Sequence, residues 1–197
     1  PRSVFSHLVG SDAERFDAFT RHQIETFEAA STTLQEGFKH KIIRHICNTA
    51  GIERYPGAQF DMVRLGIGLY GIDPFTNKML HNVTTLKTTI LQIHEVPANE
   101  TVGYSLKGVL TRDSRIAAIP IGYADGLNRH LGNGHAYCQV NGQKAPYVGN
   151  ICMDVCMIDV TDIDCKEGDK AIIFGDDLPV TVLSDILETI PYEILTS

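Results

Sequence analysis

Residues 4–27, VFSHLVGSDAERFDAFTRHQIETF, decide the fold class of this chain. The segment from Val4 to Val9 has the short apolar pattern of a strand, and the residues from Ser11 to Glu14 offer an N-cap signal for a helix. Apolar side chains from Phe16 to Phe27 then recur at helical spacing. A strand that leads into a helix in this way predicts a βα unit.

Two further segments extend this pattern along the chain. Lys41 to Ile46 is a second strand candidate, followed by Asn48-Thr49-Ala50-Gly51, and Phe60 to Arg64 is a third. Strands that alternate with helices favour parallel pairing. Three βα units cannot close an eight-stranded barrel, and a bare parallel edge leaves backbone groups unpaired. We therefore expect further barrel strands to precede these.

The sequence changes character near Pro74, where we place the boundary between a first domain, residues 1–74, and a second, residues 75–197. In the second domain β-rich segments alternate with turn residues, and Asn141-Gly142 is typical of a two-residue hairpin. Residues 181–190 have the pattern of a late helix. The fold class is therefore α/β plus mainly antiparallel β. The predicted strands of the second domain are Thr84–Ile93, Ile116–Ile119, Ala136–Val140, Cys152–Val160 and Lys170–Phe174.

Composition excludes several classes of protein. The 197 residues are 43% hydrophobic, enough to bury a core, and the net charge of -7 comes from scattered acids, which argues against binding to nucleic acid. No apolar stretch reaches the roughly 18 residues that a membrane span needs. The five cysteines are odd in number and mostly lie in apolar runs, as in a reducing compartment. We expect a cytoplasmic protein.

Three glycine-containing segments bring polar or aromatic groups beside flexible backbone: residues 101–105, 121–126 and 148–154. Glycine lets the backbone approach a ligand closely. Any one of these segments, taken singly, is better explained as a structural turn. A metal site at Cys152 and Cys156 is a weak alternative, because this spacing along a strand does not form a tetrahedral face.

Taken together and in order, four segments resemble the alanine racemase family: FDMVRLGIGLYG at 60–71, VGY at 102–104, PIGYADG at 120–126 and VGNICMD at 148–154. The resemblance runs from His7 to Ile194. It implies a (β/α)₈ barrel that holds pyridoxal 5'-phosphate, followed by a β-rich domain. It also implies a homodimer whose active sites use residues of both subunits. Residues 1–74 then match the last units of that barrel.

The family interconverts L-alanine and D-alanine, which supplies D-alanine for peptidoglycan. Proton transfer on opposite faces of the substrate needs two bases, and in the family these are the cofactor lysine and a tyrosine. The tyrosine matches Tyr104. Because an ordinary tyrosine has a pKa near 10, a neighbouring positive charge is expected to make it a better base.

The resemblance assigns cofactor contacts to the first domain. Arg64 matches the arginine that faces the pyridine nitrogen, His45 the histidine that supports it, and His7 a histidine near the ring. Without the family, Arg64 would be read as a strand-end salt bridge and the histidines as core residues. The groups that match the phosphate site are Asn48, Thr49, Gly66 and Ile67, with Thr49 where serine is commoner.

Substrate contacts are assigned to the second domain. Met153 and Asp154 match the segment that contacts the substrate carboxylate and faces the small side chain. Tyr123 matches a tyrosine that narrows access to the substrate, which favours alanine over larger amino acids. Asn150 stands where the family more often has arginine.

One expected feature does not occur in these residues. The family's first barrel strand carries a Lys-Ala-x-Ala-Tyr-Gly segment whose lysine bears the cofactor, and no lysine here stands in that context. A further phosphate-binding tyrosine of the family is not Tyr192. We therefore expect the isolated chain to be inactive and the intact parent protein to be the racemase. The alternatives are a racemase for another small amino acid, such as serine, and a non-catalytic dimerisation module.

Overall fold

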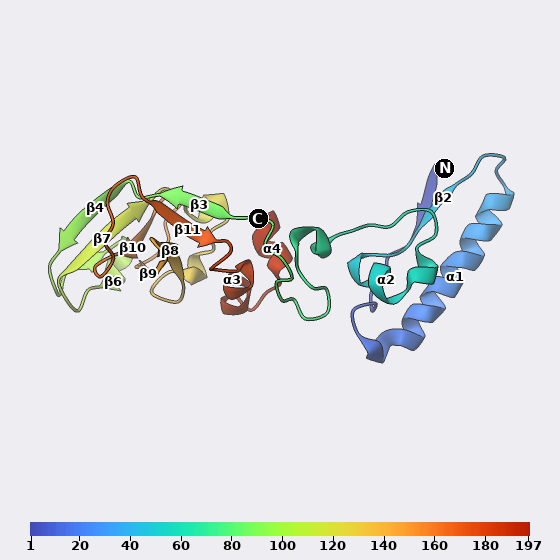
Figure 1. The fold of residues 1–197 in the computed structure, drawn as a ribbon, viewed down its shortest axis with the longest axis horizontal. Helices are drawn as coiled ribbons and strands as arrows, with labels where there is room; N and C mark the ends of the chain where they lie inside the picture. The colour runs from blue at the N-terminus through green and yellow to red at the C-terminus, as the bar shows by residue number, and fades with distance from the viewer. The chain divides into compact units, whose positions relative to one another are not determined.

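The computed structural model describes residues 1–197 and divides into two compact units, Pro1–His81 and Asn82–Ser197 (Figure 1). The first unit contains parallel βα structure. The second contains an antiparallel sheet. Both halves of the predicted fold class are confirmed.

The first unit is built on two parallel strands, β1 (Ser3–Phe5) and β2 (Ile43–His45). Their register places Phe5 directly opposite His45. The 20-residue helix α1 (Asp17–Glu36) connects the strands, and the short helix α2 (Thr49–Arg54) follows β2. Three 3₁₀ helices complete the unit: η1 (Glu14–Phe16), η2 (Pro56–Ala58) and η3 (Ile67–Tyr70).

The core of the first unit joins α1 to the residues that follow each strand. Phe27 is buried on α1 and meets Phe60 edge to face, with ring centroids 5.4 Å apart. Burying a side chain of this size contributes about 1.5–3 kcal/mol. The other buried members of the cluster are Leu8, Ile46, Cys47, Tyr55 and Ala58. Of the apolar residues predicted at helical spacing, Ile24 and Phe27 pack against this core, whereas Phe16 and Phe19 are exposed.

Two local predictions for this unit are wrong. Ser11 does not cap α1, because its buried hydroxyl donates to Asn48 Oδ1 at 2.9 Å and the helix begins at Asp17, after η1. Residues 60–64 form no strand. Phe60 has a φ of 49°, which breaks the extended conformation. The segment still joins the residues of β2 and just beyond, through Asp61 N–H to the Arg44 carbonyl and Arg64 N–H to the Cys47 carbonyl.

The second unit is built on a seven-stranded sheet in the order β3-β11-β8-β9-β10-β7-β4, with every neighbouring pair antiparallel. The strands are β3 (Leu86–Thr89), β4 (Gln92–Val96), β7 (Ser114–Ile119), β8 (Tyr137–Val140), β9 (Gln143–Val148), β10 (Cys156–Asp159) and β11 (Lys170–Phe174). A separate two-stranded ribbon joins β5 (Thr101–Val102) to β6 (Gly108–Val109). The short 3₁₀ helices are η4 (Tyr104–Leu106), η5 (Tyr123–Asp125) and η6 (Arg129–Leu131).

The two edges of this sheet come from one continuous stretch of chain. β3 pairs with β11 at one edge and β4 with β7 at the other, and only Ile90 and Leu91 lie between them. Ile90 N–H donates to the Asp169 carbonyl, whereas Leu91 N–H donates to the Ala118 carbonyl on the opposite edge. The sheet therefore curls into a barrel, which leaves no long free edge. This is why the predicted strand Thr84–Ile93 is split in two.

Turn chemistry accounts for the remaining boundaries. Asn141 and Gly142 have φ values of 48° and 75° and join β8 to β9, which confirms the predicted hairpin. The predicted strand Cys152–Val160 is shortened to β10, because Cys152 and Val155 close a turn instead. The predicted helix 181–190 becomes α3 (Val180–Ile186), which ends before Glu188 at a φ of 53°. Pro191 then opens α4 (Pro191–Thr196).

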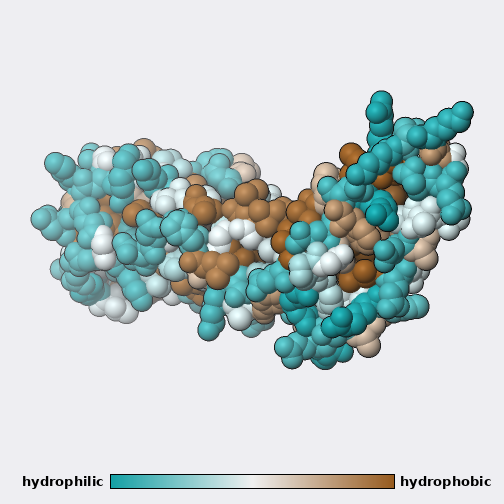
Figure 2. All heavy atoms as spheres, turned by 45° about the vertical axis from the view of Figure 1, so that its right-hand side comes forward, coloured by the Kyte–Doolittle hydropathy of each residue, from teal (hydrophilic) through white to brown (hydrophobic).

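The interior of the barrel is formed by buried apolar side chains. Tyr147 is the largest fully buried side chain, and the alanines Ala117, Ala145 and Ala171 are completely buried beside larger residues. Hydrophobic atoms also reach the surface among the hydrophilic ones (Figure 2). No helix of the structure combines the length and apolar character that crossing a membrane requires.

Candidate functional site

The first unit gathers the predicted ring-contacting residues around one guanidinium. Arg64 Nη1 donates to His45 Nδ1 at 2.6 Å, and Nη2 approaches His7 Nδ1 at 3.2 Å. Nη2 also donates to the Ser6 carbonyl at 2.8 Å. The structure thus brings together His7, just beyond β1, His45, at the end of β2, and Arg64, whose own N–H donates to the Cys47 carbonyl just beyond β2.

These contacts fix the protonation of His45. Because an arginine can only donate, His45 must offer Nδ1 as an acceptor and carry its proton on Nε2. Burial of the ring and the charge of Arg64 both lower the pKa of His45. The imidazole is therefore neutral, and the cationic group of this cluster is Arg64.

Phe5 belongs to the same cluster, although sequence reasoning did not single it out. Its ring stacks on His45 with a centroid distance of 5.4 Å and an interplanar angle of 8°, and the guanidinium carbon of Arg64 lies 5.2 Å from its centroid. The sequence feature that could have identified Phe5 is its place two residues before His7, because alternate residues of a strand point to the same face. Phe5 is 65% exposed in the chain, so it contributes a hydrophobic wall rather than a core contact.

The predicted phosphate-site residues also lie close together. The Thr49 hydroxyl accepts from Gly66 N–H at 3.0 Å and from Gly68 N–H at 3.3 Å. A Cβ at Gly68 would lie 2.7 Å from the Thr49 methyl group, so this approach requires glycine. Ile67 follows Gly66 at the start of η3. The donors are neutral hydroxyl and amide groups, which is the type of set that binds a phosphate.

Asn48 has a structural contact of its own. Its Oδ1 accepts from Gly51 N–H, which caps α2, and also from the Ser11 hydroxyl, while Nδ2 donates to the Leu8 carbonyl. The Asn48 side chain is therefore occupied in joining the segment after β1 to the start of α2. It holds Thr49 in place next to it.

In the second unit, four predicted residues from three separate segments line one pocket. Tyr104, Tyr123, Met153 and Asp154 surround a cavity of about 660 Å³. Tyr104 is 72% exposed and Met153 53%, so both side chains stand open to a ligand or a second surface. The remaining lining residues are Ser105, Arg129, Asn150, Ile151, Cys152 and Val155.

Backbone hydrogen bonds join two of the segments around this pocket, residues 121–126 and residues 148–154. Tyr123 N–H donates to the Cys152 carbonyl and Ala124 N–H to the Met153 carbonyl, each at 3.0 Å. Gly122 makes this approach possible, because a Cβ there would lie 2.2 Å from the Met153 carbonyl oxygen. Position 122 therefore requires glycine, because any side chain there would collide with the Met153 carbonyl group.

Arg129 supplies a positive charge to this pocket that the sequence reasoning missed. Its guanidinium carbon lies 5.8 Å from the centroid of the Tyr123 ring, within the range of a cation–π contact. Arg129 follows Tyr123 by six residues, so extending the Gly-Tyr-Ala-Asp-Gly motif to the next charged residue would have found it.

The buried thiols of the second unit lie apart from this pocket chemistry. Burial raises the pKa of the Cys138 thiol to about 12, and burial likewise raises the pKa of Cys156 and that of the Tyr147 phenol. These groups remain protonated inside the barrel, where they serve as apolar filling. Cys152 differs from them because it lines the pocket and is partly exposed.

These observations define a class of protein: a βα unit with a histidine-supported arginine, joined in sequence to an antiparallel barrel with a tyrosine-lined pocket. Residues 1–74 match the family model described as the N-terminal domain of alanine racemase, and residues 83–197 match the model of its C-terminal domain. The chain belongs to the alanine racemase family.

Individual relatives agree with this assignment. Alanine racemase 2 of Caldanaerobacter subterraneus subsp. tengcongensis is 40% identical over 200 residues, which cover 97% of this chain and 51% of that protein. Alanine racemase 1 of Oceanobacillus iheyensis is 38% identical over 202 residues, covering 96% of this chain and 53% of that protein. The chain spans about half the length of the relatives it matches.

Solved structures show the same fold. The alanine racemase of Clostridium difficile 630 superposes with a TM-score of 0.87 at 33% identity, covering 98% of this chain and 52% of that one. The alanine racemase of Bartonella henselae, described with covalently bound pyridoxal phosphate, gives a TM-score of 0.80 at 33% identity over 99% of this chain and 54% of that one.

Proposed function

We propose that these residues take part in the pyridoxal-phosphate-dependent interconversion of L-alanine and D-alanine, together with a barrel segment that bears the cofactor lysine. The observation that carries this proposal is the convergence of Tyr104, Tyr123, Met153 and Asp154 on one pocket. The activity would supply D-alanine for peptidoglycan in the cytoplasm. The chain alone would be inactive, because it has no lysine in a Lys-Ala-x-Ala-Tyr-Gly context.

The donor set of the first unit fits the cofactor. Thr49 and the backbone amide of Ile67 would hold the phosphate, and His7 would lie near the ring. The Gly66 amide, which donates to Thr49 Oγ1 in this structure, would donate to the phosphate instead. The bound cofactor supplies a conjugated ring that accepts the electron pair left when the substrate loses its α-proton.

Arg64 would set how strongly that ring withdraws electrons. Its Nη atoms are engaged with His45, His7 and the Ser6 carbonyl, so we assign Nε to the pyridine nitrogen. A guanidinium does not give up its proton at neutral pH, so Arg64 would leave the pyridine nitrogen unprotonated. Arg64 would thereby weaken the ring as an electron acceptor and favour return of the proton to carbon over side reactions.

Tyr104 would move the α-proton on one face of the substrate, and the lysine on the other. Its phenol is 72% exposed and lines the pocket together with Arg129. Met153 would bind the substrate carboxylate through its backbone amide. Tyr123 and Met153 would restrict the side chain to a small one, which favours alanine over serine and larger amino acids.

A homodimer with shared active sites accounts for the exposure of these groups. Tyr104 and Met153 are more than half exposed in the chain, which is unusual for residues that bind a small substrate. We propose that the second unit of one subunit covers the cofactor site of its partner. The exposed pocket would then be closed on assembly.

Complementation tests this function. The chain is mixed with the portion of the Oceanobacillus iheyensis racemase that it does not match, pyridoxal phosphate is added, and racemisation of alanine and of serine is followed. Activity should appear only in the mixture, prefer alanine, and vanish with Tyr104→Phe. Full activity of the Tyr104→Phe mixture would exclude Tyr104 as a base, and a preference for serine would change the substrate.

A further inference from the structure

The loop that carries Tyr104 has an unfavourable backbone conformation. Gly103, directly before Tyr104, has a φ of 81°, and the two residues directly after it, Ser105 and Leu106, have φ values of 59° and 54°. Two consecutive non-glycine residues with positive φ are uncommon, and such conformations persist only where surrounding contacts hold them. The position of Tyr104 therefore depends on what holds this loop.

A single side-chain amide reaches the loop. Asn150 Nδ2 donates to the carbonyl of Tyr104 itself at 3.1 Å. Gly103 also lies beside Asn150, since a Cβ on it would be in ordinary van der Waals contact with the Asn150 backbone nitrogen at 3.8 Å. Asn150 thus contacts the one residue of the loop that the proposed reaction uses.

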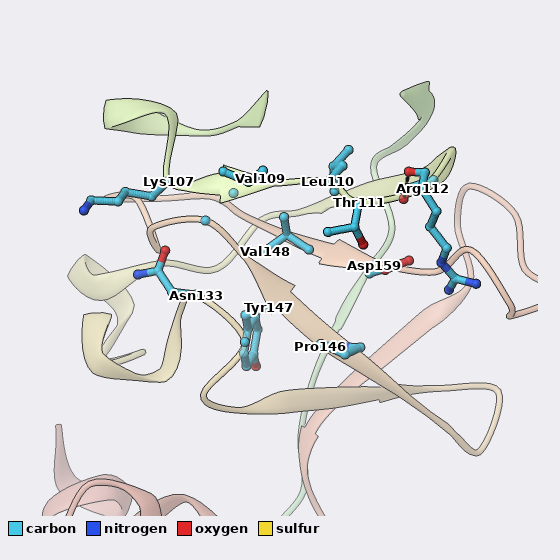
Figure 3. A pocket seen from close by; sticks show the side chains of 14 residues that line it. Lys107, Val109, Leu110, Thr111, Arg112, Asn133, Pro146, Tyr147, Val148 and Asp159 are labelled. Carbon is cyan, nitrogen blue, oxygen red and sulfur yellow. Dashed lines mark hydrogen bonds between the residues drawn. The ribbon is translucent and has the colours of Figure 1, made fainter. Parts of the chain in front are cut away.

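A second asparagine fixes the orientation of that amide. Asn133 Nδ2 donates to Asn150 Oδ1 at 3.1 Å, so the oxygen of Asn150 is turned toward Asn133 and its nitrogen toward Tyr104. Asn133 is itself anchored through its N–H to the Gly149 carbonyl at 2.8 Å. It lies at the rim of a separate cavity of about 250 Å³, beside Val148 and Lys107 (Figure 3). The chain of contacts therefore runs from Asn133 through Asn150 to Tyr104.

We propose that Asn150 is a positioning residue for Tyr104 and that Asn133 holds Asn150 in the orientation this requires. We call the two side-chain hydrogen bonds, from Asn133 to Asn150 and from Asn150 to the Tyr104 carbonyl, the clamp. The role of the clamp in catalysis rests on the proposed function, whereas the two hydrogen bonds are a property of the chain itself. Asn150 also lines the pocket, so the same side chain links the loop to the segment that carries Met153.

The clamp is tested by NMR on the isolated chain, without reference to activity. Relaxation dispersion of the residue 104–106 amides, together with the ¹⁹F signal of fluorotyrosine at Tyr104, reports the population of alternative loop conformations. Asn150→Ala should raise that population about fivefold, which corresponds to the loss of one net hydrogen bond of about 1 kcal/mol. Asn150→Asp keeps the size of the side chain but has no amide donor, so it should have the same effect.

Two further variants separate the clamp from general loosening of the sheet. Asn133→Ala should loosen the loop in the same direction by a smaller factor, because Asn150 keeps its donor but loses its fixed orientation. Gln139→Ala is the matched control, since Gln139 also donates a side-chain amide to a backbone carbonyl of this unit, that of Asp177. Unchanged loop dynamics in Asn150→Ala and Asn150→Asp would overturn the proposal.

The kinetic arm is measured in the complemented mixture described above. Asn150→Ala should lower kcat in proportion to the loss of the ordered loop conformation seen by NMR, with less than a twofold change in KM, whereas Gln139→Ala should leave both unchanged. If the loop loosens but the wild-type mixture has no racemase activity, the clamp stands and the proposed function fails. If the mixture is active and Asn150→Ala keeps the wild-type kcat, the positioning role is excluded.

Discussion

Replacing Gly122 by alanine should destabilise the second unit by separating two segments that form its pocket. The new Cβ would lie 2.2 Å from the Met153 carbonyl oxygen and 2.3 Å from that of Cys152. Its φ of -149° is open to any residue, so the effect is purely steric. The same two carbonyls accept the Tyr123 and Ala124 amides at 3.0 Å, and these bonds must lengthen or break.

The size of the effect follows from these contacts. Each of the two backbone hydrogen bonds contributes about 1 kcal/mol net, and forcing an extra methyl group into a packed site costs about 1–3 kcal/mol. We expect the free energy of unfolding of this unit to fall by about 3–5 kcal/mol. With a urea dependence of about 2 kcal/mol per molar, the midpoint should drop by about 2 M.

The assay is urea unfolding of the chain, followed by circular dichroism and tyrosine fluorescence. Gly57→Ala is the matched control, because a Cβ there meets no atom within 4 Å and its φ is not positive. The control should stay within about 0.5 kcal/mol of wild type. If Gly122→Ala unfolds within 1 kcal/mol of wild type, the close approach of the two segments is not as described.

Two other predictions concern titratable groups. Cys152 should be the first of the five thiols to react with a disulfide reagent under native conditions, because the other four are buried and burial raises the pKa of Cys138 to about 12; early labelling of Cys138 or Cys156 would contradict the barrel interior. The pKa of His45 is lowered, so its neutral form stabilises the first unit fully above the ordinary pKa of about 6.5, and this stabilisation is lost as the pH falls through the lower folded-state value. The urea midpoint of the first unit should therefore decline as the pH falls from about 6.5 toward the folded-state pKa of His45, and level off once NMR shows the native ring protonated. A midpoint that rises on acidification would refute the neutral form of His45.

The elements that could be predicted from the sequence are those whose signals are local. The strand Lys170–Phe174 and the Asn141-Gly142 turn appear as predicted, because alternation and positive-φ turn residues act within a few residues. The wrong predictions depend on distant partners. Ser11 has the residue type of a helix cap, yet its hydroxyl is used by Asn48, 37 residues away.

The residues of the candidate site also separate into those with local sequence signals and those that depend on distant partners. The motifs around Arg64, Tyr104, Tyr123 and Met153 could be singled out because each carries its chemistry in a short segment. Phe5 and Asn150 could not be given their contacts, since stacking on His45 and a bond to the Tyr104 carbonyl depend on strand register and loop conformation. In the sequence Asn150 stands out only as a departure from the arginine common in the family, and the structure gives it a contact of its own.

The most direct test of the account is where the cofactor becomes attached. The chain is incubated with pyridoxal phosphate, alone and with the lysine-bearing portion of the Oceanobacillus iheyensis enzyme, reduced with borohydride and analysed by mass spectrometry, while alanine racemisation is followed. We predict no specific adduct and no turnover for the chain alone, and an adduct on the added portion with turnover in the mixture. A single modified lysine within these 197 residues, accompanied by turnover of the chain alone, would contradict the account.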